Sequence, residues 1–194
     1  MKSLSKKLSY YLRHNLDIFN YSKDGYVKIS ELREKNIIKK NTTIDAIDKI
    51  VKNDSKNRYD LKFEINNGYK EYYIRANQGH SSGNLDYSLI LEEIKEPIPN
   101  IFHGTFIKKI DSIKNTCLNK MTRHFIHFAA DDIIHNHLKR SISQVKVYVD
   151  MKKAMDDEIK FYYAKNKVIL SNGKNNDGII PAKYFTKIVY LDKS

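Results

Sequence analysis

The chain has 194 residues, and 41% of them are apolar, so it is long enough to bury a core in one large domain or two small ones. The 35 Lys and Arg residues outnumber the 23 Asp and Glu residues, and the resulting net charge of +12 favours a polyanionic partner such as nucleic acid. The single cysteine, Cys117, excludes an intramolecular disulfide and a cysteine-based zinc site.

The N-terminal segment interleaves charged and apolar residues, which is not the pattern of a signal peptide. No later segment approaches the roughly 20 apolar residues of a membrane span. We therefore expect a soluble, cytoplasmic protein with no membrane partner, and we expect a monomer. The lysine runs alone do not prove nucleic-acid binding, because lysines among Asn and Ile equally fit a solvated face.

The first segment is expected to be an amphipathic helix, because Leu4, Leu8 and Leu12 repeat every four residues. This helix would deliver Arg13 and His14 at its C-terminal end. The guanidinium of Arg13 and the titratable imidazole of His14 would then lie next to each other at the end of this helix.

Two shorter helices and a hairpin are expected next. One helix fits Ser30 to Asn36 with Ser30 as its N-cap, and another follows Thr42 and Thr43. Apolar residues then alternate in the first hairpin strand: Tyr59, Leu61, Phe63 and Ile65. A tight turn at residues 67–68 leads into a return strand over residues 69–74.

Three helices and a hairpin predict a winged-helix-like domain over residues 1–84. Such domains often bind DNA through a basic helix, so a noncatalytic nucleic-acid binder is one alternative. The third helix argues against base reading, because Asp45, Asp48 and Asp54 outnumber its lysines, Lys49 and Lys52.

A linker is expected over residues 85–99, which carry Pro97 and Pro99. Beyond it, short β-rich runs alternate with helical stretches: residues 100–103, 125–128, 145–149, 160–164, 168–170 and 187–190. This mixture predicts an α+β domain with a mostly antiparallel sheet over residues 100–194.

Three polar clusters carry the chemistry. The first, Ile74 to Ser81, packs guanidinium, amide, imidazole and hydroxyl groups into one strand end, with Gly79 giving the backbone access to a phosphate or sugar. The second is Met121 to His127, where strand alternation would place Arg123, Phe125 and His127 on one face. The third is Phe102 to Thr105, at the end of a strand.

These clusters and the first helix resemble the RNA 2′-phosphotransferase family, the KptA-type or tRNA 2′-phosphotransferase enzymes. The family's ordered motifs are an LSxxLSxxLRH helix, an IRANQGHS loop, an HGT turn and an MxRxHVH strand. They stand here at Leu4 to His14, Ile74 to Ser81, His103 to Thr105 and Met121 to His127. The resemblance spans nearly the whole chain.

The resemblance implies an ADP-ribosyltransferase-like split β-sheet that binds NAD, preceded by a winged helix that forms part of the RNA site. It assigns the phosphate-gripping, catalytic group to Arg13, His14, Arg75 and Arg123. The first three come from the helical domain and the last from the other, so we expect the phosphate between them. The implied NAD-binding residues are His103, Gly104, Thr105, His127 and Val168. The implied RNA-binding residues are Gln78, His80, Ser81 and Arg140.

The implied reaction has two steps. An oxygen of the RNA 2′-phosphate attacks C1″ of the nicotinamide ribose and expels nicotinamide; O2″ then attacks phosphorus, releasing 2′-hydroxyl RNA and ADP-ribose 1″,2″-cyclic phosphate. Arginines suit this chemistry because they hold phosphate as bidentate donors and neutralise developing charge. No metal is implied, because arginines neutralise the phosphate.

The chain departs from the family's usual residues at several positions: Leu16, Phe125, Ala129, Ser141 and Ile142. A second alternative is therefore an ADP-ribosyltransferase that acts on another acceptor, such as a terminal phosphate of nucleic acid or a protein side chain.

Overall fold

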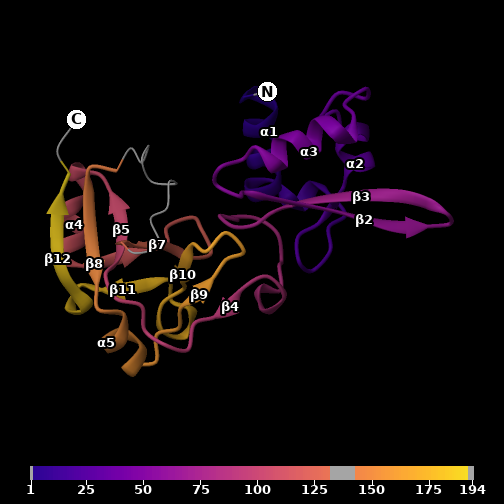
Figure 1. Cartoon of the computed structure of the whole chain (residues 1–194). Coiled ribbons are helices and arrows are strands. Elements are labelled where there is room, and N and C mark those ends of the chain that lie inside the picture. The colour runs from indigo at the N-terminus through magenta and orange to yellow at the C-terminus, as the bar shows by residue number, and fades with distance from the viewer. Residues whose placement is uncertain (1, 132–142, 192–194) are drawn as a thin grey trace. The chain divides into compact units, whose positions relative to one another are not determined.

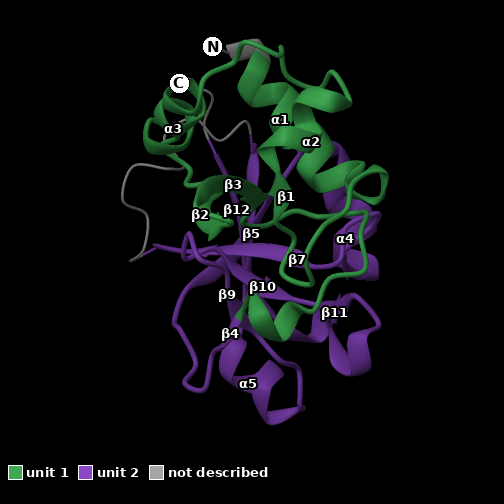
Figure 2. Cartoon of the chain, turned by 90° about the vertical axis from the view of Figure 1, so that its right-hand side faces the viewer, with its two compact units in different colours: residues 1–91 green, residues 92–194 purple. Residues whose placement is uncertain are grey.

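The computed structural model describes residues 2–131 and 143–191. The chain divides into two compact units, Met1–Leu91 and Glu92–Ser194, which Figure 2 draws in separate colours. The division falls inside the segment expected to be a linker. Leu85 and Ile90 from that segment belong to the core of the first unit, and Ile94 belongs to the core of the second.

The first unit contains three helices: α1 (Lys2–His14), α2 (Ile29–Glu34) and α3 (Ile44–Lys52) (Figure 1). Leu8 and Leu12 of α1 are fully buried, as the four-residue spacing predicted. Thr43 is the N-cap of α3, and its hydroxyl accepts a hydrogen bond from the amide of Ala46 at 3.2 Å. Most of the core of this unit is formed where these helices meet the base of a small sheet.

The predicted cap of the second helix is wrong. The helix α2 begins at Ile29, its N-cap is Lys28, and no side chain caps it. The Ser30 hydroxyl instead donates to Glu71 Oε1 at 3.2 Å. The Ser30 hydroxyl therefore bonds a residue of a distant strand, Glu71, instead of capping the helix as the local sequence predicted.

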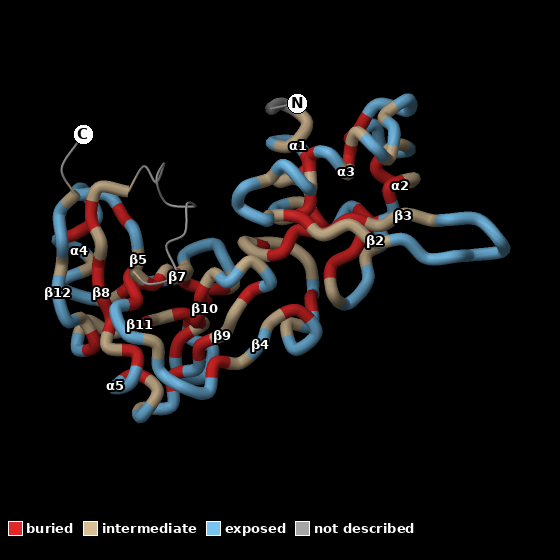
Figure 3. Tube along the Cα trace, viewed as in Figure 1, coloured by how far each residue is buried: buried red, intermediate tan, exposed pale blue. Residues whose placement is uncertain are grey.

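The sheet of the first unit has the order β1-β3-β2, with both pairings antiparallel. Its strands are β1 (Val27–Lys28), β2 (Tyr59–Asn66) and β3 (Tyr69–Ala76). Asn67 and Gly68 both have positive φ and form the predicted turn. The hairpin is buried at its base and exposed towards its tip, as Figure 3 shows; Ile65 near the tip is 68% exposed.

The second unit is built on a seven-stranded sheet of order β12-β8-β5-β7-β10-β9-β4. Every pairing in it is antiparallel, which confirms the predicted sheet type. The strands are β4 (Glu92–Glu93), β5 (Ile101–Thr105), β7 (Ile126–Ala130), β8 (Val145–Val149), β9 (Tyr162–Tyr163), β10 (Ile169–Ser171) and β12 (Phe185–Tyr190). A separate pair joins β6 (Cys117–Asn119) to β11 (Ile179–Pro181).

Two short helices, α4 (Ile110–Asn115) and α5 (Met151–Asp156), accompany this sheet. Single 3₁₀ turns complete the described structure: Leu16–Ile18, Tyr87–Leu89, Ile107–Lys109, Lys174–Asn176 and Ala182–Tyr184. Core residues of the sheet alternate along β7, where Ile126, Phe128 and Ala130 are buried while His127 and Ala129 are partly exposed.

The alternation predicted through Arg123 is wrong, because β7 begins only at Ile126. Residues 121–125 form turns and bends, and the amide of Arg123 donates to the Lys120 carbonyl at 3.1 Å. Met121 takes a positive φ of 56°, which a continuous strand excludes. Arg123 therefore lies in a turn that leads into the strand.

Candidate functional site

The C-terminal end of α1 is joined to the loop that follows β3. The Ser81 amide donates to the Arg13 carbonyl at 2.8 Å, and the Ser82 hydroxyl accepts from the Leu16 amide at 2.8 Å. The His14 Nδ1 lies 2.8 Å from Ser81 Oγ. These bonds satisfy groups at the helix end and fix the loop against it. The structure thus brings Arg13, His14 and Ser81 together, although 66 or more residues separate the partners in the chain.

Arg13 lies against the backbone at Gly79, which has a φ of +81°. A Cβ at this position would stand 3.6 Å from Arg13 Cδ, Nε and Cζ. A side chain would therefore meet Arg13 only in ordinary van der Waals contact. Gly79 is needed for the positive φ, and Arg13 is the side chain that lies nearest to this position.

The rest of the Ile74 to Ser81 loop is anchored from inside. The Asn77 side-chain amide donates to the carbonyls of Asn57 at 2.8 Å and Tyr59 at 3.1 Å. His80 is 3% exposed, and its ring lies 6.5 Å from that of Tyr87. Gln78 is partly exposed. His80 is thus buried within the unit, whereas Gln78 and Ser81 are partly exposed to solvent.

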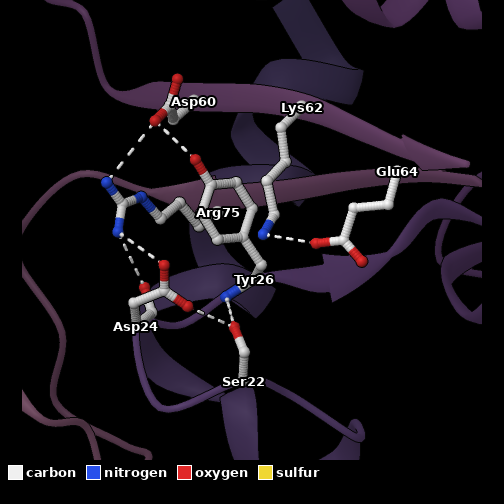
Figure 4. A network of polar contacts seen from close by, with 7 residues as sticks. All are labelled: Ser22, Asp24, Tyr26, Asp60, Lys62, Glu64 and Arg75. Atoms are coloured by element: carbon white, nitrogen blue, oxygen red, sulfur yellow. Dashed lines mark hydrogen bonds and ion pairs between the residues drawn. The ribbon is translucent and has the colours of Figure 1, made fainter. Parts of the chain in front are cut away.

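Arg75 lies at the centre of a polar network, drawn in Figure 4, and is only 8% exposed. Its Nη1 donates to the Asp24 carbonyl at 3.1 Å and lies 3.5 Å from Asp24 Oδ2. Its Nη2 lies 3.5 Å from Asp60 Oδ2. The guanidinium carbon stands 4.6 Å from the centre of the Tyr26 ring. Two carboxylates and an aromatic face therefore surround one positive charge.

The carboxylates of this network have supports of their own. The Tyr26 hydroxyl donates to Asp60 Oδ2 at 2.6 Å, and the Ser22 hydroxyl donates to Asp24 Oδ1 at 2.5 Å. Burial, and next the hydrogen bond to Asp60, raise the pKa of Tyr26 above its ordinary value. The phenol therefore keeps its proton at neutral pH and remains a donor to the carboxylate.

Three polar atoms around this loop have no hydrogen-bond partner within the described residues, although they are buried: Arg75 Nε, Asn77 Oδ1 and Gln78 Oε1. A buried polar group without a partner costs about 1–3 kcal/mol. Such groups commonly mark a place where a ligand or an ordered water completes the structure. Two acceptors and one donor are thus available close together in the chain.

The second group of predicted residues lies on neighbouring strands of the large sheet. Backbone pairing between β5 and β7 is limited to Ile101 with Ala130 and Phe102 with Ala129. Beyond these pairs, the His103 side chain rather than the backbone bonds β7, because its Nδ1 lies 2.9 Å from the His127 carbonyl. Because a carbonyl only accepts, His103 Nδ1 carries the hydrogen.

Burial lowers the pKa of His103, and the nearby positive charge of Arg123 lowers it further, while the bond to the His127 carbonyl opposes both effects. The ring is therefore neutral at pH 7, with an unprotonated Nε2 that accepts hydrogen bonds. The second histidine is held similarly, since His127 Nδ1 lies 3.1 Å from the Phe125 carbonyl. Backbone carbonyls thus set the orientation of both rings.

The remaining predicted NAD-binding residues adjoin these histidines. Gly104 is exposed, and a Cβ there would lie 2.5 Å from Ser143 Oγ. Thr105 is buried, and its carbonyl accepts from the Gln144 amide at 2.8 Å. Val168 immediately precedes β10, the strand in which Leu170 is paired with His127. His103, His127 and Val168 therefore lie in or next to β5, β7 and β10, which are consecutive strands of the sheet.

Two arginines complete the predicted set. Arg123 is exposed and belongs to the second unit, where its positive charge contributes to lowering the pKa of His103. Arg140 lies outside the described residues. Sequence reasoning missed Asp24, Tyr26 and Asp60; the one signal that could have found Asp60 is the hairpin register, which places it directly opposite Arg75.

Residues 2–131 and 143–191 contain no group of three or more His, Cys, Asp or Glu placed to hold a metal ion. Over the same part of the chain, no helix has both the length and the apolar character needed to cross a membrane.

A sequence model described as RNA 2′-phosphotransferase, Tpt1 / KptA family matches residues 1–173 of the chain. Among known proteins, tRNA 2′-phosphotransferase 1 of Danio rerio is 31% identical over 95% of this chain and 83% of its own length. A probable RNA 2′-phosphotransferase of Fusobacterium nucleatum is 30% identical over 93% of this chain and 95% of its own. The Homo sapiens tRNA 2′-phosphotransferase 1 is 32% identical over 97% and 75%, respectively. The chain therefore belongs to the RNA 2′-phosphotransferase, Tpt1/KptA family.

Proposed function

We propose that the protein is an NAD-dependent RNA 2′-phosphotransferase, which removes an internal 2′-phosphate from RNA and leaves a 2′-hydroxyl. The observation that carries the proposal is the family match over residues 1–173, which includes Arg13, His14, Arg75 and Arg123. The relatives are named for transfer of a 2′-phosphate of RNA or tRNA. The net charge of +12 supports a polyanionic substrate.

Arg13, Arg75 and Arg123 would grip the 2′-phosphate. A guanidinium offers donors in a planar fork that matches phosphate oxygens, and it keeps its charge at any physiological pH. Negative charge develops on the phosphate oxygens when the phosphorus is attacked, so fixed cations there lower the barrier. Arg13 lies beside Gly79 in the loop that follows β3, at the helix end where the Ser81 amide bonds the Arg13 carbonyl, which supports a role for both segments in one site.

His14 would orient the phosphate or pass a proton to the departing 2′-oxygen. It is exposed, and its Nδ1 lies 2.8 Å from Ser81 Oγ, so the ring has one preferred direction. An imidazole has an unperturbed pKa near 6.5, which suits proton transfer at neutral pH. Ser81 then acts as the group that sets the orientation of the base.

His103, Gly104, Thr105, His127 and Val168 would hold NAD, whose part when bound is to supply the ADP-ribosyl group that accepts the phosphate. The residues fit this ligand. The neutral His103 can accept a hydrogen bond from a ribose hydroxyl through Nε2. Gly104 presents exposed backbone without a side chain. Val168 adds no negative charge that would repel an incoming phosphate.

The architecture supports the same proposal. The order of three helices followed by a hairpin fits a winged-helix-like domain for RNA and phosphate, assigned to residues 1–84. The antiparallel sheet in residues 100–194, with only two residue pairs between β5 and β7, fits an ADP-ribosyltransferase-like split sheet that binds NAD. Residues 85–99 would connect the two.

The direct test is to incubate the pure protein with an RNA oligonucleotide that carries one internal 2′-phosphate, with and without NAD. A matched oligonucleotide with a terminal 5′-phosphate serves as the control substrate. We expect a free 2′-hydroxyl, nicotinamide and ADP-ribose 1″,2″-cyclic phosphate from the first substrate only when NAD is present. ADP-ribose attached to the terminal phosphate, with the 2′-phosphate untouched, would instead identify an ADP-ribosyltransferase for another acceptor.

A further inference from the structure

The side chains around Arg75 form a cage, here defined as Asp24, Tyr26 and Asp60. Each member contacts the guanidinium directly. Asp24 meets Nη1 through its carbonyl at 3.1 Å and its carboxylate at 3.5 Å, Asp60 meets Nη2 at 3.5 Å, and the Tyr26 ring centre lies 4.6 Å from the guanidinium carbon (Figure 4). The three residues come from two segments far apart in the chain.

The cage is itself braced, which distinguishes it from a chance ion pair. Tyr26 uses both of its functional parts, because its ring faces Arg75 while its hydroxyl holds Asp60 at 2.6 Å. Ser22 holds Asp24 through its hydroxyl at 2.5 Å, and the same Ser22 oxygen accepts from the Tyr26 amide at 3.0 Å. The two carboxylates and the ring are therefore fixed relative to one another.

The contacts of the cage are not spread evenly over the guanidinium. An arginine has five N–H donors, on Nε and on the two Nη atoms. The cage takes up Nη1 and Nη2, whereas Nε is buried and has no hydrogen-bond partner within the described residues. Within the described residues, Nε is thus the guanidinium nitrogen that is left without a hydrogen-bond partner, and a buried donor of a charged group without a partner points to a missing acceptor.

Given the proposed function, on which this inference rests, we propose that Asp24, Tyr26 and Asp60 are positioning residues that hold Arg75 by its Nη end and so present its Nε–H to the 2′-phosphate. The phosphate oxygen is the acceptor that the structure lacks. Positioning matters here because a donor aimed at a developing charge contributes most when it needs no reorganisation during the reaction.

The test uses the full-length protein and four variants. Asp24→Asn and Asp60→Asn keep the shape of the side chain and remove its charge, and Tyr26→Phe removes only the hydroxyl that holds Asp60. Glu71→Gln is the matched control: this carboxylate lies on the same hairpin, is 28% exposed against 29% for Asp24, and pairs with Lys28 rather than Arg75. Tyr26→Phe also preserves the test if an Asp variant fails to fold.

Transfer kinetics give the first readout. We expect kcat to fall about 10- to 100-fold in Asp60→Asn and Asp24→Asn, less in Tyr26→Phe, and less than about twofold in Glu71→Gln. In an Arg75→Lys background, Asp60→Asn should cause little further loss, because its effect passes through the guanidinium. Equal losses from Asp60→Asn in both backgrounds would show a merely structural role and overturn the proposal.

A second readout does not depend on turnover. The Arg75 Nε–H resonance, identified by its absence in Arg75→Lys, should shift when a 2′-phosphorylated RNA oligonucleotide is added without NAD. The shift should be lost in Asp60→Asn and retained in Glu71→Gln. If the chemical shift of the wild-type resonance does not change when the oligonucleotide is added, the cage proposal is wrong even when transfer proceeds. If it responds in this Asp60-dependent way but no transfer occurs with NAD, the cage stands and the proposed function fails.

Discussion

Arg75 and Arg123 are assigned the same task, yet their surroundings in the two units differ greatly. Arg75 is 8% exposed and held between two carboxylates and a tyrosine ring. Arg123 is exposed in a turn before β7, and its positive charge lowers the pKa of His103. The contrast shows that the fold fixes one of these two cations in advance and leaves the other exposed to solvent.

The two arrangements have different energetic consequences. A buried guanidinium is tolerated because its carboxylate partners compensate for lost hydration, so removing it leaves those partners unpaired. An exposed arginine is already hydrated and adds little to folding. Substituting Arg75 should therefore change both stability and activity, whereas substituting Arg123 should change activity alone.

The largest effect is expected for Arg75→Ala. It should lower kcat by about 10²- to 10³-fold, since one transition-state donor is removed. It should also lower the free energy of unfolding by about 2 kcal/mol, because Asp24 and Asp60 lose their cation but retain some solvent. Urea denaturation and single-turnover kinetics measure the two quantities.

The control is Arg33→Ala, which removes another partly buried arginine of the same unit, one that donates to the Thr42 carbonyl at 2.9 Å. Its kcat should stay within about twofold of the wild type. An Arg75→Ala protein with unchanged stability would show that the cage contributes nothing to folding and would remove the contrast.

Arg123→Ala should lower kcat by about 10²-fold and leave the free energy of unfolding within about 0.5 kcal/mol of the wild type. The pKa of His103 should rise, because the positive charge that lowers it in addition to burial is removed. An NMR titration of the histidine ring measures that change. A large loss of stability in this variant would mean that Arg123 is built into the fold as firmly as Arg75.

A smaller effect is expected for Ser81→Ala, which removes the bond to His14 Nδ1. The loss of one hydrogen bond predicts a fall in kcat of about 3- to 10-fold. Ser82→Ala is the matched control, because this neighbouring serine bonds the Leu16 amide at the same helix end but not His14. Equal falls in kcat for both variants would assign the effect to the helix end rather than to His14.

The smallest effect concerns pH. Because burial depresses the pKa of His103 in the folded protein, its neutral form contributes stability that is fully present above about pH 6.5 and is lost as pH falls through the depressed value. His103→Gln should therefore flatten the fall in unfolding free energy as the pH is lowered below about 6.5. An unchanged slope in urea denaturation at several pH values would contradict the assigned cause.

Much of the fold could be predicted from sequence in segments where the apolar residues recur with the period of a helix or of a strand. The spacing of Leu8 and Leu12 gave the first helix, and alternation from Tyr59 gave the hairpin, because each buries a single face. Short elements that form only through contacts with distant parts of the chain could not be predicted. The strands β4, β6 and β11 have two or three residues each and depend on partners distant in the chain.

The candidate site divides in the same way. Motifs identified Arg13, His14 and Ser81, and the structure brings these three together. They did not identify Asp24 or Tyr26, because a supporting residue is recognised by what it contacts rather than by its neighbours in sequence. The turn at Arg123 was missed for a related reason: the positive φ at Met121, which the sequence pattern does not reveal, interrupts the predicted alternation.

The most direct test of the central claim is to follow the phosphorus atom itself. An RNA oligonucleotide is prepared with a ³²P label confined to one internal 2′-phosphate and is incubated with the wild-type protein and NAD. We predict that the label leaves the RNA and appears in ADP-ribose 1″,2″-cyclic phosphate, and that no label moves without NAD. Release of the label as inorganic phosphate, or release that does not depend on NAD, would contradict the account.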